Sequence, residues 1–117
     1  MYINVKHEIG GNSCITIQDG KKIYNLIHDL IIDKQSVTLD FTGIEFFAAP
    51  FFNAAIGRLF KDIDINTLHK YVVFSFMSYI GEEILFNVIR NSQKYYSDPI
   101  YRKSVDSVMK KLSEDGL

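Results

Sequence analysis

The chain has 117 residues, which suits one domain with a core of its own, and its net charge of −1 gives no overall attraction to nucleic acid or anionic membranes. Hydrophobic residues make up 47% and charged residues 23%, the balance of a soluble globular protein. No apolar run approaches the ~20 residues of a membrane span, and the N-terminal segment lacks the apolar region of a signal peptide. A lone cysteine, Cys14, fits a reducing compartment. We therefore expect a single cytoplasmic domain, residues 1–117, that does not enter the membrane.

The first third of the chain predicts two strands and a helix. Residues 2–5 and 14–17 are rich in strand formers, and the turn signal at Gly10-Gly11-Asn12 between them predicts a hairpin. Residues 19–33 then place apolar side chains at i, i+1, i+4, i+7 and i+8, the stripe of an amphipathic helix. Asp19 is the expected N-cap of this helix.

The middle of the chain predicts strand, helix and strand. Residues 36–41 (SVTLDF) read as a strand, followed by a short extended piece at 44–47. A helix is expected from Pro50, because proline suits the first helical position, to about Lys61. Residues 71–76 (YVVFSF) are dense in β-branched and aromatic side chains and predict an inner strand.

Two helices are expected at the C-terminal end. The first spans residues 79–91, and the second restarts at Asp98-Pro99. The second has an apolar stripe predicted to face the core, made of Ile100, Tyr101, Val105, Val108, Met109 and Leu112. The order β-β-α-β-α-β-α-α predicts an α/β fold with a mixed, mostly parallel sheet of about four strands and helices packed on it.

The central segment VTLDFTGIEFFAAPFFNAAIG, residues 37–57, is similar to the centre of STAS domains, the anti-sigma factor antagonist fold. In that family a strand ends in Asp, a turn follows, and Asp-Ser-Ser opens a helix. The chain more closely resembles a bacterial family of short STAS-like proteins of unknown function, through FFNAAIG at 51–57 and NSQKYYSD at 91–98. The resemblance implies a STAS-like fold, and it implies partner contacts at the central helix and the loop before it.

The chain departs from STAS domains at the regulatory position. In partner-switching members, a serine at the start of that helix is phosphorylated by a kinase that is also the binding partner. Placing Asp40 on the motif's Asp puts Ala48, Ala49 and Pro50 where Asp-Ser-Ser would stand, and none of them can accept a phosphate. The resemblance thus implies a docking surface without the phosphorylation switch.

A helical wheel divides the helix that begins at Pro50 into two faces. At about 100° per residue, Phe52, Ala55, Ile56 and Leu59 cluster on the side expected to face the sheet, and Leu39 of the preceding strand is expected in the same core. The other side would face outward. The surface predicted to bind a partner consists of Phe47, Ala48, Ala49, Pro50, Phe51, Asn53, Ala54, Gly57 and Lys61. The alternative for Gly57 is that it packs beneath another part of its own domain.

No set of residues suggests catalysis, a metal or a cofactor. The three histidines, His7, His28 and His69, are scattered, and no phosphate-binding glycine loop occurs. Asp40 is expected to shape the turn after its strand, and Cys14 is expected to be a buried thiol. We therefore expect a non-enzymatic regulatory module that binds a protein partner. The resemblance points to a histidine-kinase-like ATPase as that partner.

Two other functions remain open from the sequence. Between Arg90 and Lys111, basic residues are interleaved with tyrosines, a pattern that can bind nucleic acid. The second possibility is therefore a nucleic-acid-associated or defence-system accessory protein that uses the basic C-terminal helices. A solvated helix face with tyrosines packing inward explains the same pattern and is preferred. The third possibility is a small-ligand sensor that uses a cleft near residues 40–49.

Overall fold

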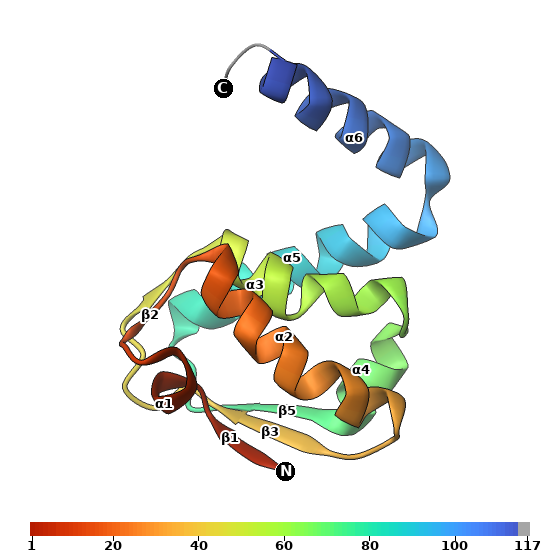
Figure 1. Cartoon of the computed structure of the whole chain (residues 1–117). Helices are drawn as coiled ribbons and strands as arrows, with labels where there is room; N and C mark the ends of the chain where they lie inside the picture. Colours follow the sequence, from red (N-terminus) through yellow and green to blue (C-terminus); the bar gives the residue numbers. More distant parts are fainter. Residues whose placement is uncertain (115–117) are drawn as a thin grey trace.

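The computed structural model of the chain describes residues 1–114, and within them α-helices and short parallel strands alternate (Figure 1). No helix among these residues combines the length and the apolar character needed to cross a membrane. The elements in chain order are β1 (Tyr2–Asn4), α1 (Val5–Ile9), β2 (Ser13–Cys14), α2 (Ile17–Ile32), β3 (Val37–Asp40), β4 (Phe46–Phe47), α3 (Ala49–Ala55), the 3-10 helix η1 (Gly57–Lys61), α4 (Ile65–Tyr71), β5 (Val72–Ser75), α5 (Tyr79–Ser97) and α6 (Pro99–Glu114).

The strands form two small sheets in which every pairing is parallel. The larger sheet has the order β1-β3-β5, and its register places Ile3 beside Leu39 and Leu39 beside Phe74. The smaller sheet pairs β2 with β4. Because successive strand residues point to opposite faces, Ile3 and Leu39 enter the core while Tyr2 and Val73 are exposed on the other face. Helices α2, α3, α4 and α5 lie over the core face (Figure 1). The fold is therefore α/β, as predicted, and all of its pairings are parallel rather than mixed.

Aromatic side chains join the two sheets to α3. The buried ring of Phe41 lies 6.1 Å from the ring of Phe47, 6.2 Å from Phe52 and 6.5 Å from Phe74, measured between centroids. Phe47 in turn stacks on Phe52, with 5.8 Å between centroids. These spacings are in the range of favourable aromatic pairs. Leu39 and Ile56 are fully buried beside this cluster, as predicted for the core.

Helices α2 and α3 approach closely at Gly20. A Cβ atom added at Gly20 would lie 2.7 Å from the Cβ of Ala54 and closer still to the carbonyl oxygen of Phe51. Real Cβ atoms do not approach other atoms so closely, so a side chain at residue 20 would push the two helices apart. The absence of a side chain at Gly20 thus sets the distance between α2 and α3.

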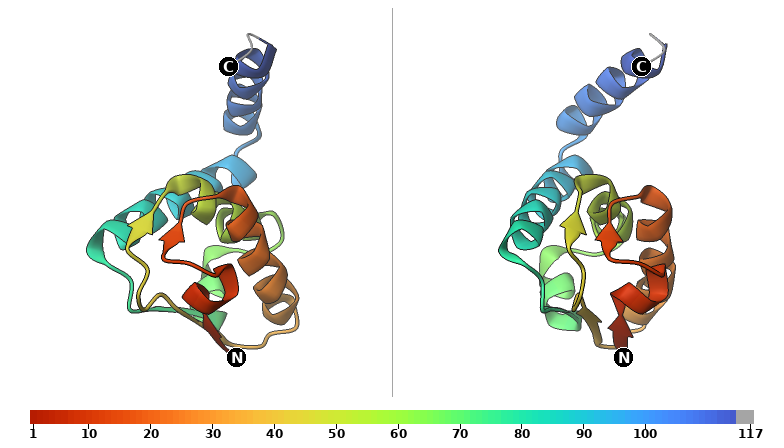
Figure 2. Two further views of the ribbon diagram at one scale, coloured as in Figure 1. Left: turned by 60° about the vertical axis from the view of Figure 1, so that its left-hand side comes forward. Right: turned by 90° about the vertical axis from the view of Figure 1, so that its left-hand side faces the viewer.

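The predicted N-terminal hairpin is wrong. Strands β1 and β2 belong to different sheets, and α1 separates them. The side chain of Asn4 accepts a hydrogen bond from the backbone N–H of His7 and starts α1, and Gly10 ends it with φ of 70°. Figure 2 shows β2 and β4 as adjacent arrows pointing toward the N-terminal ends of α2 and α3. Both predicted strands exist but are shorter than predicted, because Val5 already belongs to α1 and Ile17 to α2, and the helix between the strands was missed.

Thr16, and not Asp19, is the N-cap of α2. The backbone N–H of Asp19 donates to Oγ1 of Thr16 over 3.1 Å, so the helix starts at Ile17, two residues earlier than predicted. A Thr three residues before an acidic residue is a common way to begin a helix. The sequence contained this signal.

The helix predicted from Pro50 to Lys61 is two helices. α3 ends at Ala55, Ile56 has a φ of −119°, and the chain continues as the 3-10 helix η1. Helix α4 follows and was not predicted; the side chain of Asp64 caps it by accepting from the backbone N–H of Thr67 over 2.8 Å. Helix α5 extends to Ser97 and not only to Asn91.

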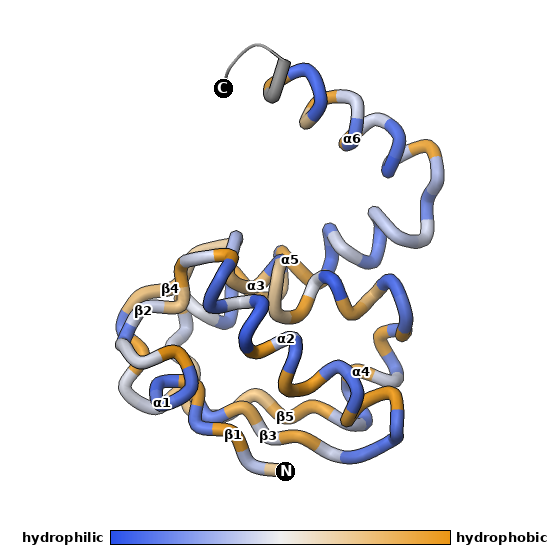
Figure 3. Tube along the Cα trace, viewed as in Figure 1, coloured by the Kyte–Doolittle hydropathy of each residue, from blue (hydrophilic) through white to orange (hydrophobic). Residues whose placement is uncertain are grey.

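The last helix begins at Pro99, as predicted, but its apolar stripe does not join the core. Val108 is 58% exposed and Met109 is 62% exposed, and Ile100 and Leu112 are also exposed. Helix α6 stands away from the body of the domain (Figures 1 and 2), and hydrophobic and hydrophilic residues alternate along it (Figure 3). The predicted amphipathic pattern is therefore present, but most of its apolar face has no partner within the described part of the chain.

The close approach at Gly20 leads to a stability prediction. We expect Gly20→Ala to destabilise the fold by about 1–3 kcal/mol through overpacking, although alanine is the better helix former by about 1 kcal/mol. Urea unfolding would measure the loss. Gly11→Ala is the matched control, because a Cβ atom at Gly11 meets nothing within 4 Å. A Gly20→Ala protein as stable as the Gly11→Ala protein would contradict this account of the helix contact.

A second prediction concerns pH. Nε2 of His28 lies 2.9 Å from Oδ2 of Asp62, and Nδ1 lies 3.0 Å from Oδ1 of Asp29. The hydrogen bonds to Asp62 and then to Asp29 raise the pKa of His28. Because the folded-state pKa is the higher one, the stabilisation is complete below the unfolded pKa of about 6.5 and is lost as pH rises through the folded pKa.

We therefore expect wild type to be more stable than His28→Gln at about pH 5.5, with the difference shrinking toward about pH 8.5. Urea unfolding of both proteins across this range is the measurement. His69→Gln serves as a control for the loss of a histidine. A stability difference that does not vary with pH would show that the charged imidazole makes no net contribution.

Candidate protein-binding surface

The nine residues predicted to bind a partner are not all accessible. Four are exposed: Ala49, Pro50, Asn53 and Lys61. Three are half-buried: Phe47, Ala48 and Ala54. The remaining two, Phe51 and Gly57, are buried. The predicted surface is thus only partly available.

Gly57 packs inside the domain, against the prediction that it faces outward. A Cβ atom added there would lie 3.3 Å from Cγ1 of Val88 and would overlap Oγ of Ser92, both on α5. Two changes account for this: the backbone turns at Ile56, so the single-helix wheel no longer applies, and α5 is longer than expected and covers η1. The alternative, in which Gly57 packs beneath its own domain, is the one observed. A Gly57→Arg variant would force η1 away from α5 and could not probe an outer surface.

Helix α2 covers the second part of the predicted face. The ring of Phe51 is fully buried and lies 5.3 Å from that of Phe52, edge to face. The side chain of Ala54 is directed at Gly20 of α2. Both residues therefore hold α3 in place; Phe51 is not available to another protein, and Ala54 is only partly accessible.

The loop that enters α3 keeps an exposed surface. Ala49 and Pro50 are exposed at the start of α3, and Asn53 is exposed one turn later. Phe46 precedes them and is 56% exposed. Its neighbour Phe47 is held by stacking on Phe52, which anchors the loop to the core.

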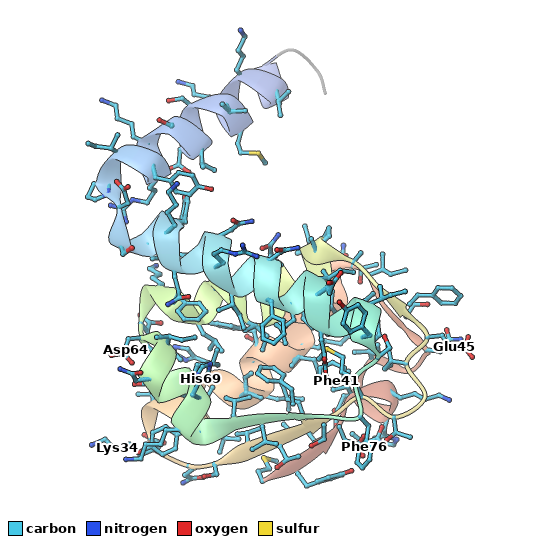
Figure 4. All side chains as sticks on the ribbon, turned by 180° about the vertical axis from the view of Figure 1, so that it is seen from behind. Lys34, Phe41, Glu45, Asp64, His69 and Phe76 are labelled. Carbon is cyan, nitrogen blue, oxygen red and sulfur yellow. The ribbon has the colours of Figure 1, made fainter. Side chains whose placement is uncertain are left out.

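The start of α5 extends this surface, and the sequence prediction missed it. Tyr79 is 73% exposed and Ile80 is 67% exposed. A Cβ atom at Gly81 would lie 3.0 Å from the ring of Phe47, so this turn of α5 packs against β4. Figure 4 shows this end of the molecule beside the labelled Glu45, which immediately precedes β4. We call Phe46, Ala49, Pro50, Asn53, Tyr79 and Ile80 the β4 apolar surface.

One signal in the sequence could have identified this extension. Ser78 is the N-cap of α5, its side chain accepting from the backbone N–H of Gly81 over 3.2 Å. Two large apolar residues follow the cap directly. Large apolar residues in the first turn of a helix either pack in the core or remain on the surface, where they can form a contact site. Periodicity alone does not decide between these two arrangements.

Asp40 has a structural role. Its buried carboxylate accepts hydrogen bonds from the Tyr2 hydroxyl, from the backbone N–H of Thr42 over 2.8 Å and from Oγ1 of Thr42 over 2.6 Å. These bonds shape the turn after β3, as the sequence predicted. Three protein donors therefore occupy this carboxylate, which lies at the start of the segment 40–49 where the ligand-sensor alternative places its cleft.

The tyrosines of the basic C-terminal region contact other residues of the chain. The Tyr95 hydroxyl donates to Oδ1 of Asp106 over 2.6 Å, and its ring meets that of Tyr96 edge to face. Nζ of Lys94 lies 4.4 Å from the centroid of Tyr101. These contacts join α5 to α6. They favour the interpretation in which the tyrosines pack inward over one in which they stack on nucleic-acid bases.

No group of three or more His, Cys, Asp or Glu side chains in residues 1–114 is arranged to hold a metal ion.

The two segments that resemble the STAS-like family meet in space. Asn53 and Gly57 from the first, and Asn91, Ser92 and Tyr95 from the second, line one shallow groove of about 280 Å³ between η1, α5 and α6. The packing of α5 against η1 therefore explains why both segments matter for the fold.

The fold and the central segment agree with a match to a known family. Residues 19–78 match the STAS-like domain of unknown function (DUF4325), which is a little over half of the 117 residues. The chain belongs to this family of STAS-like domains. No curated protein and no solved structure matches the chain.

The environment of Cys14 leads to a prediction about reactivity. Its thiol is fully buried, and burial, assisted by the charge of Asp19, raises its pKa to about 12. Because only the thiolate reacts, we expect native protein to resist a thiol-specific reagent at neutral pH. The same protein in concentrated urea should react fully within minutes. Rapid modification of the native protein would show that β2 opens readily.

Proposed function

We propose that the protein is a non-enzymatic regulatory module that binds a protein partner through the β4 apolar surface. The observation that carries the proposal is the exposure of three large apolar side chains, Phe46 of β4 and Tyr79 and Ile80 at the start of α5, in two elements that pack together where Gly81 meets Phe47. Large apolar side chains gathered on one part of a surface mark a site of contact with another molecule.

The chemistry of the surface supports a protein rather than a small ligand. Aromatic and aliphatic anchors of this kind contribute most of the binding energy in protein interfaces. Asn53 is exposed on α3, one turn after Ala49, and offers both a hydrogen-bond donor and an acceptor. Ala49 and Pro50 are small or rigid, so a partner can approach the backbone closely. We propose a partner with a complementary apolar pocket.

The STAS resemblance suggests the class of this partner and how binding is regulated. It implies partner contacts at α3 and the loop before it, and it points to a histidine-kinase-like ATPase acting in the cytoplasm. Ala48, Ala49 and Pro50 occupy the position of the phosphorylated serine. We propose that binding at this surface is not switched by phosphate at the start of α3.

Partner capture tests the proposal. Tagged wild-type protein would be recovered from its native host, and co-purifying proteins identified by mass spectrometry. We expect Phe46→Asp to lose the specific partner, because a charge replaces an exposed apolar anchor without disturbing the core. The affinity of the purified partner should fall at least about tenfold, as measured by calorimetry.

Val73→Asp is the matched control. Val73 is 54% exposed, but it lies on the outer face of the β1-β3-β5 sheet, away from β4. This variant should bind as wild type does. Equal binding by wild type and a folded Phe46→Asp protein would exclude the β4 apolar surface as the docking site.

A further inference from the structure

The apolar stripe of α6 was predicted to join the core, and most of it stays outside. Tyr101, Val105, Val108 and Leu112 are spaced by four, three and four residues, so they form one continuous stripe. Tyr101 and Val105 are half-buried near α5, whereas Val108, Met109 and Leu112 are exposed. The outer half of the stripe therefore lacks a partner in its own chain.

The same chain carries an apolar groove of about 300 Å³ on its body. It lies between α4, β5 and the first half of α5 and is lined by Val72, Phe74, Leu85, Phe86, Ile89 and Glu82, among others. Phe86 is 63% exposed at its edge. Figure 4 views the molecule from this side, with His69 of the groove labelled and α6 extending away above it.

The groove and the stripe are separated within one molecule. Helix α6 leaves from the C-terminal end of α5, whereas the groove lies along its N-terminal half (Figures 1 and 4). A second copy of the chain brings the two together. We propose that the protein forms a two-fold symmetric dimer in which α6 of each copy lies in the α4–β5–α5 groove of the other.

Charge supports a second copy as the occupant. At about 100° per residue, Arg102 and Lys111 flank the apolar stripe on its two sides. Glu82 and His69 are the titratable side chains of the groove, and no Lys or Arg is among the described residues that line it. A basic amphipathic helix thus meets an apolar groove that carries a carboxylate, the arrangement of helix-in-groove recognition.

Size also supports an exchange of both helices. A 16-residue helix is about 24 Å long, and one such contact alone is small for a stable interface. Two-fold symmetry makes the contact twice, which brings the buried area toward the range of about 1,200–2,000 Å² that stable dimers use. Apart from His69 and Glu82 the groove is lined by apolar side chains, so the exposed Val108, Met109 and Leu112 suit it.

Light scattering after size-exclusion chromatography tests the dimer. Wild type should have a mass of about 27 kDa, twice the 13.5 kDa of one chain, and should dissociate on dilution. Val108→Glu should shift the mass to that of one chain. Ser107→Glu is the matched control, because it adds the same side chain one residue earlier on the solvent side of α6 and should leave the dimer intact.

The groove is tested separately. Phe86→Glu should also give a monomer, whereas Asn87→Glu, at the next position, which is also exposed, should stay a dimer. Thermal unfolding would confirm that each variant is folded.

A wild type of 13.5 kDa at every concentration would overturn the proposal. So would a dimeric Phe86→Glu protein, which would show that α6 pairs with something other than the groove. Neither Val108 nor Phe86 belongs to the β4 apolar surface, so these results leave the proposed function untouched.

Discussion

The rest of the structure depends on the close contact between α2 and α3. Gly20 allows the backbone of α3 to lie directly against α2, with Ala54 filling the space that a side chain would occupy. This contact directs Phe51 and Phe52 into the core, where Phe52 meets Phe41 and Phe47. Since Phe47 belongs to β4, the position of the exposed loop follows from the distance between two helices.

A second close contact determines which face of the central segment is exposed. Gly57 lies beneath Val88 and Ser92 of α5, so η1 is covered by a helix that arrives much later in the chain. The same helix presents Tyr79 and Ile80 beside β4 at its other end. One helix thus closes the outer side of η1 and supplies two of the six residues of the β4 apolar surface.

The two proposals use different parts of the molecule and can operate together. The β4 apolar surface lies around β4 and the start of α5, whereas the dimer would use α6 and the groove between α4, β5 and α5. A dimer built in this way would present two β4 apolar surfaces. Binding to an oligomeric partner would then gain from two linked contacts, without any stronger contact at either one.

The sequence by itself determined the features that depend on local chemistry: the α/β class, the core positions of Leu39 and Ile56, the buried Cys14, the turn at Asp40 and the helix start at Pro99. Periodicity and capping suffice for these. The tertiary structure decided the rest. The predicted hairpin does not form because β1 and β2 pair with strands far along the chain. Gly57 was predicted to be exposed and is buried, whereas the apolar stripe of α6 was predicted to be buried and is mostly exposed. A helix face made of small or apolar residues is buried only if another helix packs against it. That helix can come from a distant part of the chain, so the local sequence does not decide the outcome.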